Sequence, residues 1–207
     1  NGIDLDYFQP REKSKNLLKK FNIQGDDIVF VSVAGTALHK GWQFLVEATS
    51  KLDNELRKNI KIIIVGNSPK DEIMKQYVNQ LNMQNNVIFT GFMNDVREAV
   101  SIADIGFVLS IGVETISFAC REMMSMGKPV LVSAYAGLSE NINNNQNGWV
   151  VKQKSSNQVY KFLQKINELD LQQYAYMAKQ KANQEFGSVK FVNSTIDLYR
   201  KIKGTGL

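Results

Sequence analysis

The fold is decided by residues 105–132, which read IGFVLSIGVETISFACREMMSMGKPVLV. Two short apolar runs, at 105–109 and 129–132, enclose a polar loop and an amphipathic segment at 115–126. Two β-branched runs on either side of a helical pattern are typical of a βαβ unit, in which a helix connects two parallel strands. This stretch therefore predicts part of a parallel sheet that is covered by helices.

The same alternation extends through most of the chain. Further strands are predicted at 28–33, 61–65, 87–90 and 148–151, and further helices at 43–52, 70–81 and 94–102. In the second of these helices, the spacing of Ile73, Tyr77 and Leu81 predicts one buried side.

The two ends of the chain have a different character. Residues 1–10 predict an extended connector before a helix that begins near Arg11, and residues 155–203 predict amphipathic helices that are broken near Asp170 and at Gly187. We expect an α/β fold with a doubly wound, Rossmann-like parallel sheet and C-terminal helices. In this interpretation residues 1–207 form one domain, with its core at about 11–154 and the helical segment at about 155–203.

Composition disfavours several classes of protein. The apolar runs are too short to span a bilayer, so we expect a soluble protein. The net charge of +5 comes mostly from lysines spread over helical segments, which disfavours nucleic acid as a partner, although a basic face could attract an anionic membrane. The single cysteine, Cys120, lies in an apolar segment, which indicates a buried thiol and a reducing cytoplasm.

Function is expected where strands end and helices begin, because ligands of doubly wound sheets bind at these junctions. At 33–41 a turn of small residues, with Gly35 and Thr36, ends in His39 and Lys40 before a helix. Such a turn lets the backbone approach a phosphate, although it is neither a Walker loop nor a dinucleotide fingerprint. Lys40 could equally be an exposed lysine at a helix start. His39 could be an ordinary polar loop residue, and a metal role is disfavoured because the chain has no second histidine and no cysteine pair.

Two more junctions have polar loops. Residues 67–69 predict a helix cap followed by proline at the first helical position, and a contact with a nucleotide is the alternative. Gly91 and Phe92 follow a predicted strand and could hold a flat base, although Phe92 is equally plausible in the core.

The junction at 110–122 carries two carboxylates, Glu114 and Glu122, which are eight positions apart. An acid near a helix start is commonly a cap, which would explain Glu114 without a ligand. Glu122 lies inside an otherwise apolar helix, where a carboxylate needs hydrogen-bond donors. The hydroxyls of a sugar or a ribose are such donors.

A series of motifs resembles a known family. Glu114, seven intervening residues and Glu122 are followed by MSMGKPV at 124–130 and AGLSE at 136–140, and this series resembles the signature of family-4 retaining glycosyltransferases of GT-B architecture. The resemblance covers most of the chain and starts with NGID at 1–4, which resembles the segment leading into the second domain of these enzymes. It continues through Lys40-Gly41, Val65-Gly66, Phe89-Thr90-Gly91, Ala103-Asp104 and Asn147-Gly148.

The resemblance implies a role for each matching position. The donor's diphosphate would be bound by Lys40 and by the backbone N–H groups of Ile116, Ser117 and Phe118, with Gly35, Thr36 and His39 beside the same ligand. Glu122 would accept hydrogen bonds from the ribose, and Gly91 and Phe92 would hold the base. Glu114 would be the catalytic residue, facing the donor sugar near its reacting carbon and supporting the positive charge that develops there.

Two positions depart from the family pattern. The family commonly has an arginine near the first turn that shares the diphosphate with the lysine, whereas this chain has Ala34-Gly35-Thr36 there and no arginine between Arg11 and Arg57. Ser117 stands where a glycine is frequent, which alters how closely the backbone can approach a ligand.

The resemblance also implies an activity. The enzyme would transfer the sugar of a UDP-, GDP- or ADP-sugar to an acceptor with retention, without a metal or other cofactor, in glycan or cell-surface polysaccharide biosynthesis. The acceptor-binding domain would precede Asn1, so this chain is expected to be the donor-binding half and inactive by itself. We expect the protein in the cytoplasm or peripherally at the inner face of the membrane. The nucleotide, sugar, acceptor and linkage stay open.

Three alternatives are weaker. A nucleotide-sugar epimerase of the same architecture is disfavoured by the Glu114–Glu122 signature and the Lys40-Gly41 turn. A non-catalytic nucleotide-binding or phospho-acceptor module needs aspartates clustered at strand ends, whereas the first strand ends in Val33-Ala34-Gly35. A nicotinamide-dependent dehydrogenase is disfavoured by the missing dinucleotide fingerprint.

Overall fold

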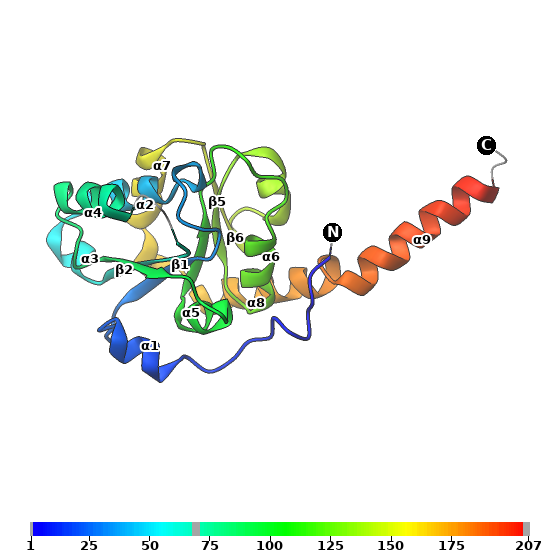
Figure 1. The fold of residues 1–207 in the computed structure, drawn as a ribbon, viewed down its shortest axis with the longest axis horizontal. Helices are drawn as coiled ribbons and strands as arrows, with labels where there is room; N and C mark the ends of the chain where they lie inside the picture. The colour runs from blue at the N-terminus through cyan, green and yellow to red at the C-terminus, as the bar shows by residue number, and fades with distance from the viewer. Residues whose placement is uncertain (1, 68–70, 205–207) are drawn as a thin grey trace.

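A parallel sheet of six strands forms the centre of the computed structural model, which describes residues 2–67 and 71–204 (Figure 1). The strands are β1 (Ile28–Ser32), β2 (Ile60–Val65), β3 (Val87–Gly91), β4 (Ile105–Val108), β5 (Val130–Ser133) and β6 (Gly148–Val151). Each predicted strand is present, and its ends differ from the prediction by one residue at most. The expected α/β fold with a doubly wound parallel sheet is confirmed.

Helices cover both faces of this sheet. Phe30 of β1 faces the layer of α2, α4 and α7, whereas its neighbours Val29 and Val31 face the layer of α1 and α5. Further along the second face, α6 and α8 pack on β4 and β5. The alternation follows the two-residue period of a strand, so both faces of β1 are apolar. The helices are α1 (Lys15–Lys20), η1 (Leu38–Lys40), α2 (Trp42–Ser50), α3 (Asn54–Lys58), α4 (Asp71–Gln80), α5 (Val96–Ile102), α6 (Phe118–Ser125), η2 (Ala136–Asn141), α7 (Ser156–Leu163), η3 (Ile166–Glu168), α8 (Leu171–Glu185) and α9 (Ser188–Gly204).

The strand order β3-β2-β1-β4-β5-β6 reverses direction between β1 and β4. These two strands are hydrogen-bonded neighbours, with Phe30 opposite Ile105 and Val31 opposite Gly106. Because both run in the same direction, the loops that follow them leave the same edge of the sheet side by side. This is the topological switch point at which open α/β sheets bind their ligands.

Three helices begin later than predicted, because a capping side chain sets each start. Ser14 caps α1, which therefore begins at Lys15 rather than near Arg11. Asp95 caps α5, so that α5 begins at Val96. Ser117 caps α6, which begins at Phe118, three residues after the predicted position.

The buried side of α4 is rotated from the predicted one. Ile73 is 59% exposed, while Met74 and Val78 are buried against the core. Tyr77 and Leu81 still pack partly against that core. Met74 and Val78 are four residues apart and fit a helical period equally well, so the predicted position of Ile73 on the buried side is wrong.

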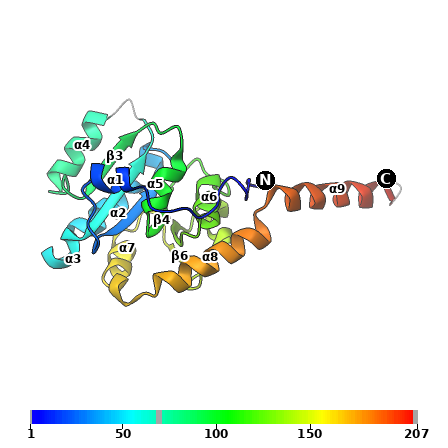
Figure 2. The same ribbon diagram turned by 90° about the horizontal axis from the view of Figure 1, so that it is seen from below.

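The N-terminal segment lies beside the junction of α8 and α9, and α9 extends from there away from the sheet to the C-terminus (Figures 1 and 2). Residues 2–10 contain no helix, and Ile3 is anchored because its N–H donates to Phe186 O and its carbonyl accepts from Ser188 N. The C-terminal helices are broken near Asp170 and at Gly187 as predicted. No helix of the described residues combines the length and the apolar character that crossing a bilayer requires.

Candidate functional site

The loops after β1 and β4 bring Lys40 and Glu114 together at the switch point. Lys40 Nζ lies 3.1 Å from Glu114 Oε2, although 74 residues separate them in the sequence. Both side chains are largely buried, with 18% and 10% of their surface exposed. The backbones meet as well, because the Ile111 N–H donates to the His39 carbonyl at 2.8 Å. Two of the predicted site residues therefore form one charged pair, with His39 beside it.

Gly41 allows this approach. It has a positive φ of 75°, and a Cβ added to it would lie 1.8 Å from the carbonyl oxygen of Leu109. Any other residue would push the η1 turn away from the end of β4, in addition to the strain of the left-handed backbone. The Lys40-Gly41 pair is thus a structural unit, in which the glycine makes room for the contact that the lysine forms.

Glu114 is held by a second donor that sequence reasoning missed. Ser110 is fully buried, and its Oγ donates to Glu114 Oε2 at 3.2 Å, the oxygen that also contacts Lys40. Glu114 Oε1 has no hydrogen bond within the described residues. Glu114 lies four residues before Phe118, so it is not the cap of α6 and the simple capping explanation is wrong.

The start of α6 differs from the predicted arrangement of amide groups. The Ser117 side chain accepts from the Cys120 N–H at 3.3 Å, and Ile116 lies before this cap. In the described part of the chain, the N–H groups of Ile116, Ser117, Phe118 and Ala119 have no hydrogen-bond partner. Unpaired amides and the positive end of the helix dipole together favour an anion here.

Glu122 lies in the second turn of α6. Its carboxylate forms no hydrogen bond and no ion pair with any described residue, and burial raises its pKa above the usual value. A desolvated carboxylate without a donor is unfavourable, so a ligand with hydroxyl groups would stabilise it. No hydrogen bond or ion pair links Glu122 to Lys40 or Glu114.

Asn67 connects the other predicted residues. Thr36 Oγ1 donates to the Asn67 carbonyl at 3.0 Å, and the Phe92 N–H donates to Asn67 Oδ1 at 2.7 Å. The Gly66 N–H also donates to the Gly91 carbonyl at 3.0 Å. The loops after β1, β2 and β3 are therefore joined at one edge. The sequence predicts Asn67 as part of a helix cap, with a contact to a nucleotide as the alternative, and the other residues of that cap, 68–69, lie outside the described residues.

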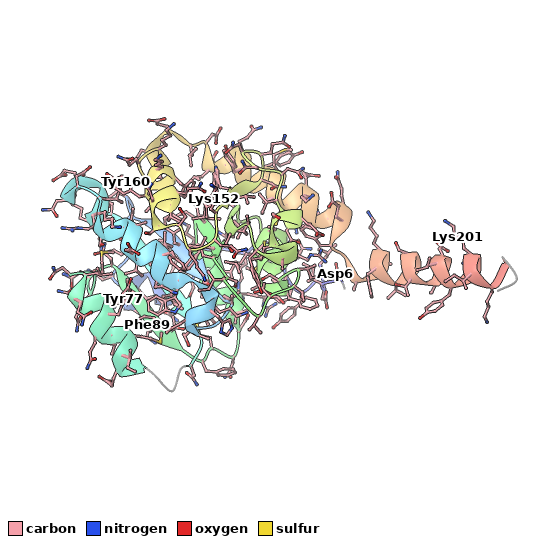
Figure 3. All side chains as sticks on the ribbon, turned by 90° about the horizontal axis from the view of Figure 1, so that it is seen from above. Asp6, Tyr77, Phe89, Lys152, Tyr160 and Lys201 are labelled. Carbon is pink, nitrogen blue, oxygen red and sulfur yellow. The ribbon has the colours of Figure 1, made fainter. Side chains whose placement is uncertain are left out.

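Phe92 is 72% exposed, so the alternative that placed it in the core is wrong. Its N–H donates to Asn67, and its ring is exposed beside the loops that follow the strands. Trp42 supports the neighbouring turn, because its Nε1 donates to the Thr36 carbonyl at 2.7 Å and its ring packs edge-on against Tyr77 and Phe89, labelled in Figure 3.

Two other polar groups nearby have structural roles. Cys120 is fully buried, and burial raises its pKa to about 12, so the predicted buried thiol is confirmed. Lys128 is also desolvated, which lowers its pKa to about 8, and its Nζ donates to the carbonyls of Ser101 and Ala103 at the C-terminal end of α5. Among the described residues, no group of three or more His, Cys, Asp and Glu side chains is arranged to hold a metal ion.

Comparison with known proteins finds a family and individual proteins with similar sequences. The family described as "Glycosyl transferases group 1" matches residues 13–184. The uncharacterized glycosyltransferase MJ1607 of Methanocaldococcus jannaschii is 24% identical over 207 residues, which cover 97% of this chain and 52% of that protein.

Solved structures share the fold. Anabaena Alr3699/HepE in complex with UDP matches with a TM-score of 0.84 and 20% identity, over 97% of this chain and 56% of that chain. The C-terminal domain of a glycosyl transferase group 1 family protein (LpcC) from Francisella tularensis matches with a TM-score of 0.76 and 21% identity, over 90% of this chain and 100% of that chain. The chain thus spans about half the length of the archaeal relative and of HepE.

Proposed function

This chain belongs to the glycosyl transferases group 1, and from that premise we propose that it is the C-terminal, donor-binding part of a family-4 retaining glycosyltransferase. It binds a nucleotide-diphospho-sugar and acts with a second domain that binds the acceptor. The match to a separate C-terminal domain from Francisella tularensis supports the assignment of this chain to the C-terminal part of such an enzyme. The reaction belongs to glycan or cell-surface polysaccharide biosynthesis, and it takes place in the cytoplasm or at the inner face of the membrane.

The contact between Lys40 and Glu114 is the observation that carries the proposal. It joins the Lys40 ammonium, on the loop after β1, to the Glu114 carboxylate, on the loop after β4. The loop that carries Glu114 leads directly into the unpaired amides at the start of α6. A diphosphate attracts the ammonium and the amides, and the hydroxyls of a sugar donate to a carboxylate. One ligand that carries both groups therefore satisfies the whole arrangement.

Each predicted residue has a place in this proposal. Lys40 leaves Glu114 for the diphosphate, which is also bound by the amides of Ser117 and Phe118, with Ile116 in the loop before them. Gly35, Thr36 and His39 line the same ligand from the first turn. Glu122 accepts from the ribose, and the exposed Phe92 ring stacks on the base above Gly91. HepE was crystallised with UDP and with UDP-glucose, so UDP is the first nucleotide to test.

The proposed chemistry is substitution at the anomeric carbon. The bond from this carbon to the diphosphate oxygen breaks, and both electrons of the bond leave with the diphosphate. Lys40 and the α6 amides stabilise the charge on the leaving group, and Glu114 stabilises the positive charge that develops on the sugar. The acceptor oxygen then bonds to the same face, and its proton passes to the departing phosphate. The protein supplies the positive charge, so no metal ion takes part.

Thermal unfolding of the chain with UDP, GDP and ADP tests this proposal. A ligand at about 100 times its dissociation constant adds roughly 2.7 kcal/mol to the stability of the folded state. We expect one of the three nucleotides to raise the melting temperature, in the presence of EDTA as well. Lys40→Ala and Glu122→Ala should each abolish this shift without unfolding the protein.

The matched controls are Lys58→Ala and Glu55→Ala, which remove an exposed ion pair on α3, next to the opposite edge of the sheet. Both control variants should keep the full nucleotide shift. Unchanged nucleotide binding in Lys40→Ala and Glu122→Ala would remove these residues from the site.

A further inference from the structure

The loop that precedes α6 is held by a buried asparagine, Asn141, the last residue of η2. Its Nδ2 donates to the carbonyl of Ile116 at 2.6 Å and to that of Leu138 at 3.2 Å. Its Oδ1 accepts from Arg121 Nε at 2.8 Å. The side chain is fully buried and joins the loop before α6, the α6 helix and η2. Sequence reasoning gave Asn141 no role.

The bond from Asn141 sets the direction of the next amide group. In a trans peptide the C=O and the N–H point in opposite directions, and the described residues contain no cis peptide. Because the Ile116 carbonyl is directed at the buried Asn141, the N–H of Ser117 must point away from it. That N–H has no acceptor among the described residues.

The Ser117 backbone is in a conformation that needs support. Its φ is +55°, in the left-handed region that a serine rarely adopts. Such strain persists where the surrounding structure determines the conformation, and it is concentrated at functional sites. The support here is η2, which lies directly against the loop: a Cβ added to Gly137 would be 2.9 Å from the Thr115 carbonyl oxygen.

We propose that Asn141 is a positioning residue for the donor's diphosphate. Through the Ile116 carbonyl it orients the Ser117 N–H, and with it the start of α6, toward the phosphate oxygens. Asn141 itself does not touch the ligand. This inference rests on the proposed function. It adds that the orientation of the amides at the start of α6, which would bind the phosphates, depends on a buried residue of η2.

If Asn141 positions the Ser117 amide, its removal should weaken binding of the phosphates more than binding of the nucleoside. Without the bond from Asn141, the Ile116–Ser117 peptide is free to rotate, and the left-handed Ser117 loses its support. Binding of the phosphates should weaken, whereas binding of the nucleoside, which relies on Gly91, Phe92 and Glu122, should not. A residue with a merely structural role would lower the melting temperature without distinguishing between the two parts of the ligand.

Two variants of the full 207-residue chain test the inference. Asn141→Ala removes all four hydrogen bonds of this side chain, including a long one of 3.5 Å from Nδ2 to the Gly137 carbonyl. Asn141→Asp keeps an acceptor for Arg121 and loses only the Nδ2 donor. UDP binding is measured by calorimetry, and the weaker binding of uridine by ligand-observed NMR. Asn86→Ala is the matched control, because the Asn86 Nδ2 also donates to two backbone carbonyls, those of Arg57 and Ile60. Asn86 lies at the opposite edge of the sheet.

We expect both Asn141 variants to bind UDP at least tenfold more weakly than the unmodified chain, with uridine binding changed by less than twofold. Asn86→Ala should bind both ligands normally. Normal UDP binding by folded Asn141→Ala would overturn the inference, even if Asn141→Asp binds weakly, since that pattern indicates repulsion by the added carboxylate. An equal loss of uridine and UDP binding would also overturn it. If the unmodified chain bound no nucleoside diphosphate, the proposed function would fail, and this inference with it.

Discussion

Glu122 shows, at the scale of single residues, how a binding group can oppose folding. Burial raises its pKa from the ordinary value of 4.5, and no described residue donates to its carboxylate. The folded protein therefore keeps the proton at pH values at which the unfolded chain has already lost it. As the pH rises through 4.5 toward the folded pKa, unfolding becomes more favourable, and above that pKa the full penalty is present.

Glu122→Gln should therefore be more stable than the unmodified protein at pH 7. The gain should shrink as the pH falls and disappear below about pH 4, where both states carry the proton. Chemical unfolding at several pH values measures the difference. The same variant should bind UDP more weakly, because an amide replaces the acceptor for the ribose hydroxyls. A loss of stability at pH 7 would show that Glu122 has a stabilising partner in the folded protein.

At the scale of elements, the contact between η1 and the end of β4 determines whether Lys40 reaches Glu114. The contact has no room for a side chain at Gly41, whose added Cβ would lie 1.8 Å from the Leu109 carbonyl oxygen. The bond from the Ile111 N–H to the His39 carbonyl holds the two loops together on the other side of Lys40. The two loops therefore form a single rigid support for the charged pair.

Gly41→Ala should lower the free energy of unfolding by more than about 1 kcal/mol from the left-handed backbone alone, and the clash with Leu109 adds to this loss. UDP binding should weaken as well, because the turn that carries Lys40 is displaced. Gly25→Ala is the control, since an added Cβ there meets nothing within 4 Å. It should stay within about 0.5 kcal/mol of the unmodified protein. Equal stability of the two variants in urea unfolding would contradict this account of Gly41.

At the scale of the whole molecule, the reversal of strand order between β1 and β4 creates the site. It makes neighbours of two loops that are distant in sequence, and three hydrogen bonds add the loops after β2 and β3 to the same edge. The proposed donor site is therefore complete within this fold. In the proposed function, the acceptor site belongs to a second domain.

We accordingly expect the 207-residue chain to bind UDP but to transfer no sugar by itself. Incubation of the chain with UDP-glucose and candidate acceptors, followed by measurement of the released UDP and of the glycosylated product, tests this. A reaction without the chain gives the rate of spontaneous hydrolysis. Transfer to a defined acceptor well above that rate would show that the chain needs no second domain.

The sequence by itself determined the class of fold and the identity of the main motifs. Strand and helix periods are local properties, so each βαβ unit could be predicted from its own residues, to within one residue at the strand ends. Helix starts were less accurate at Ser14, Asp95 and Ser117, because a capping bond depends on backbone geometry that the apolar pattern does not contain.

Only the tertiary structure decided which of the candidate residues meet. The contact between Lys40 and Glu114 exists because β1 and β4 are adjacent in the sheet, and no local pattern states which strands are neighbours. The same holds for Asn67 and Asn141, whose side chains bond to groups on other loops. Hydrogen bonds between distant segments form only after the sheet has brought their partners together, which is why the sequence identifies the groups and the fold assembles them.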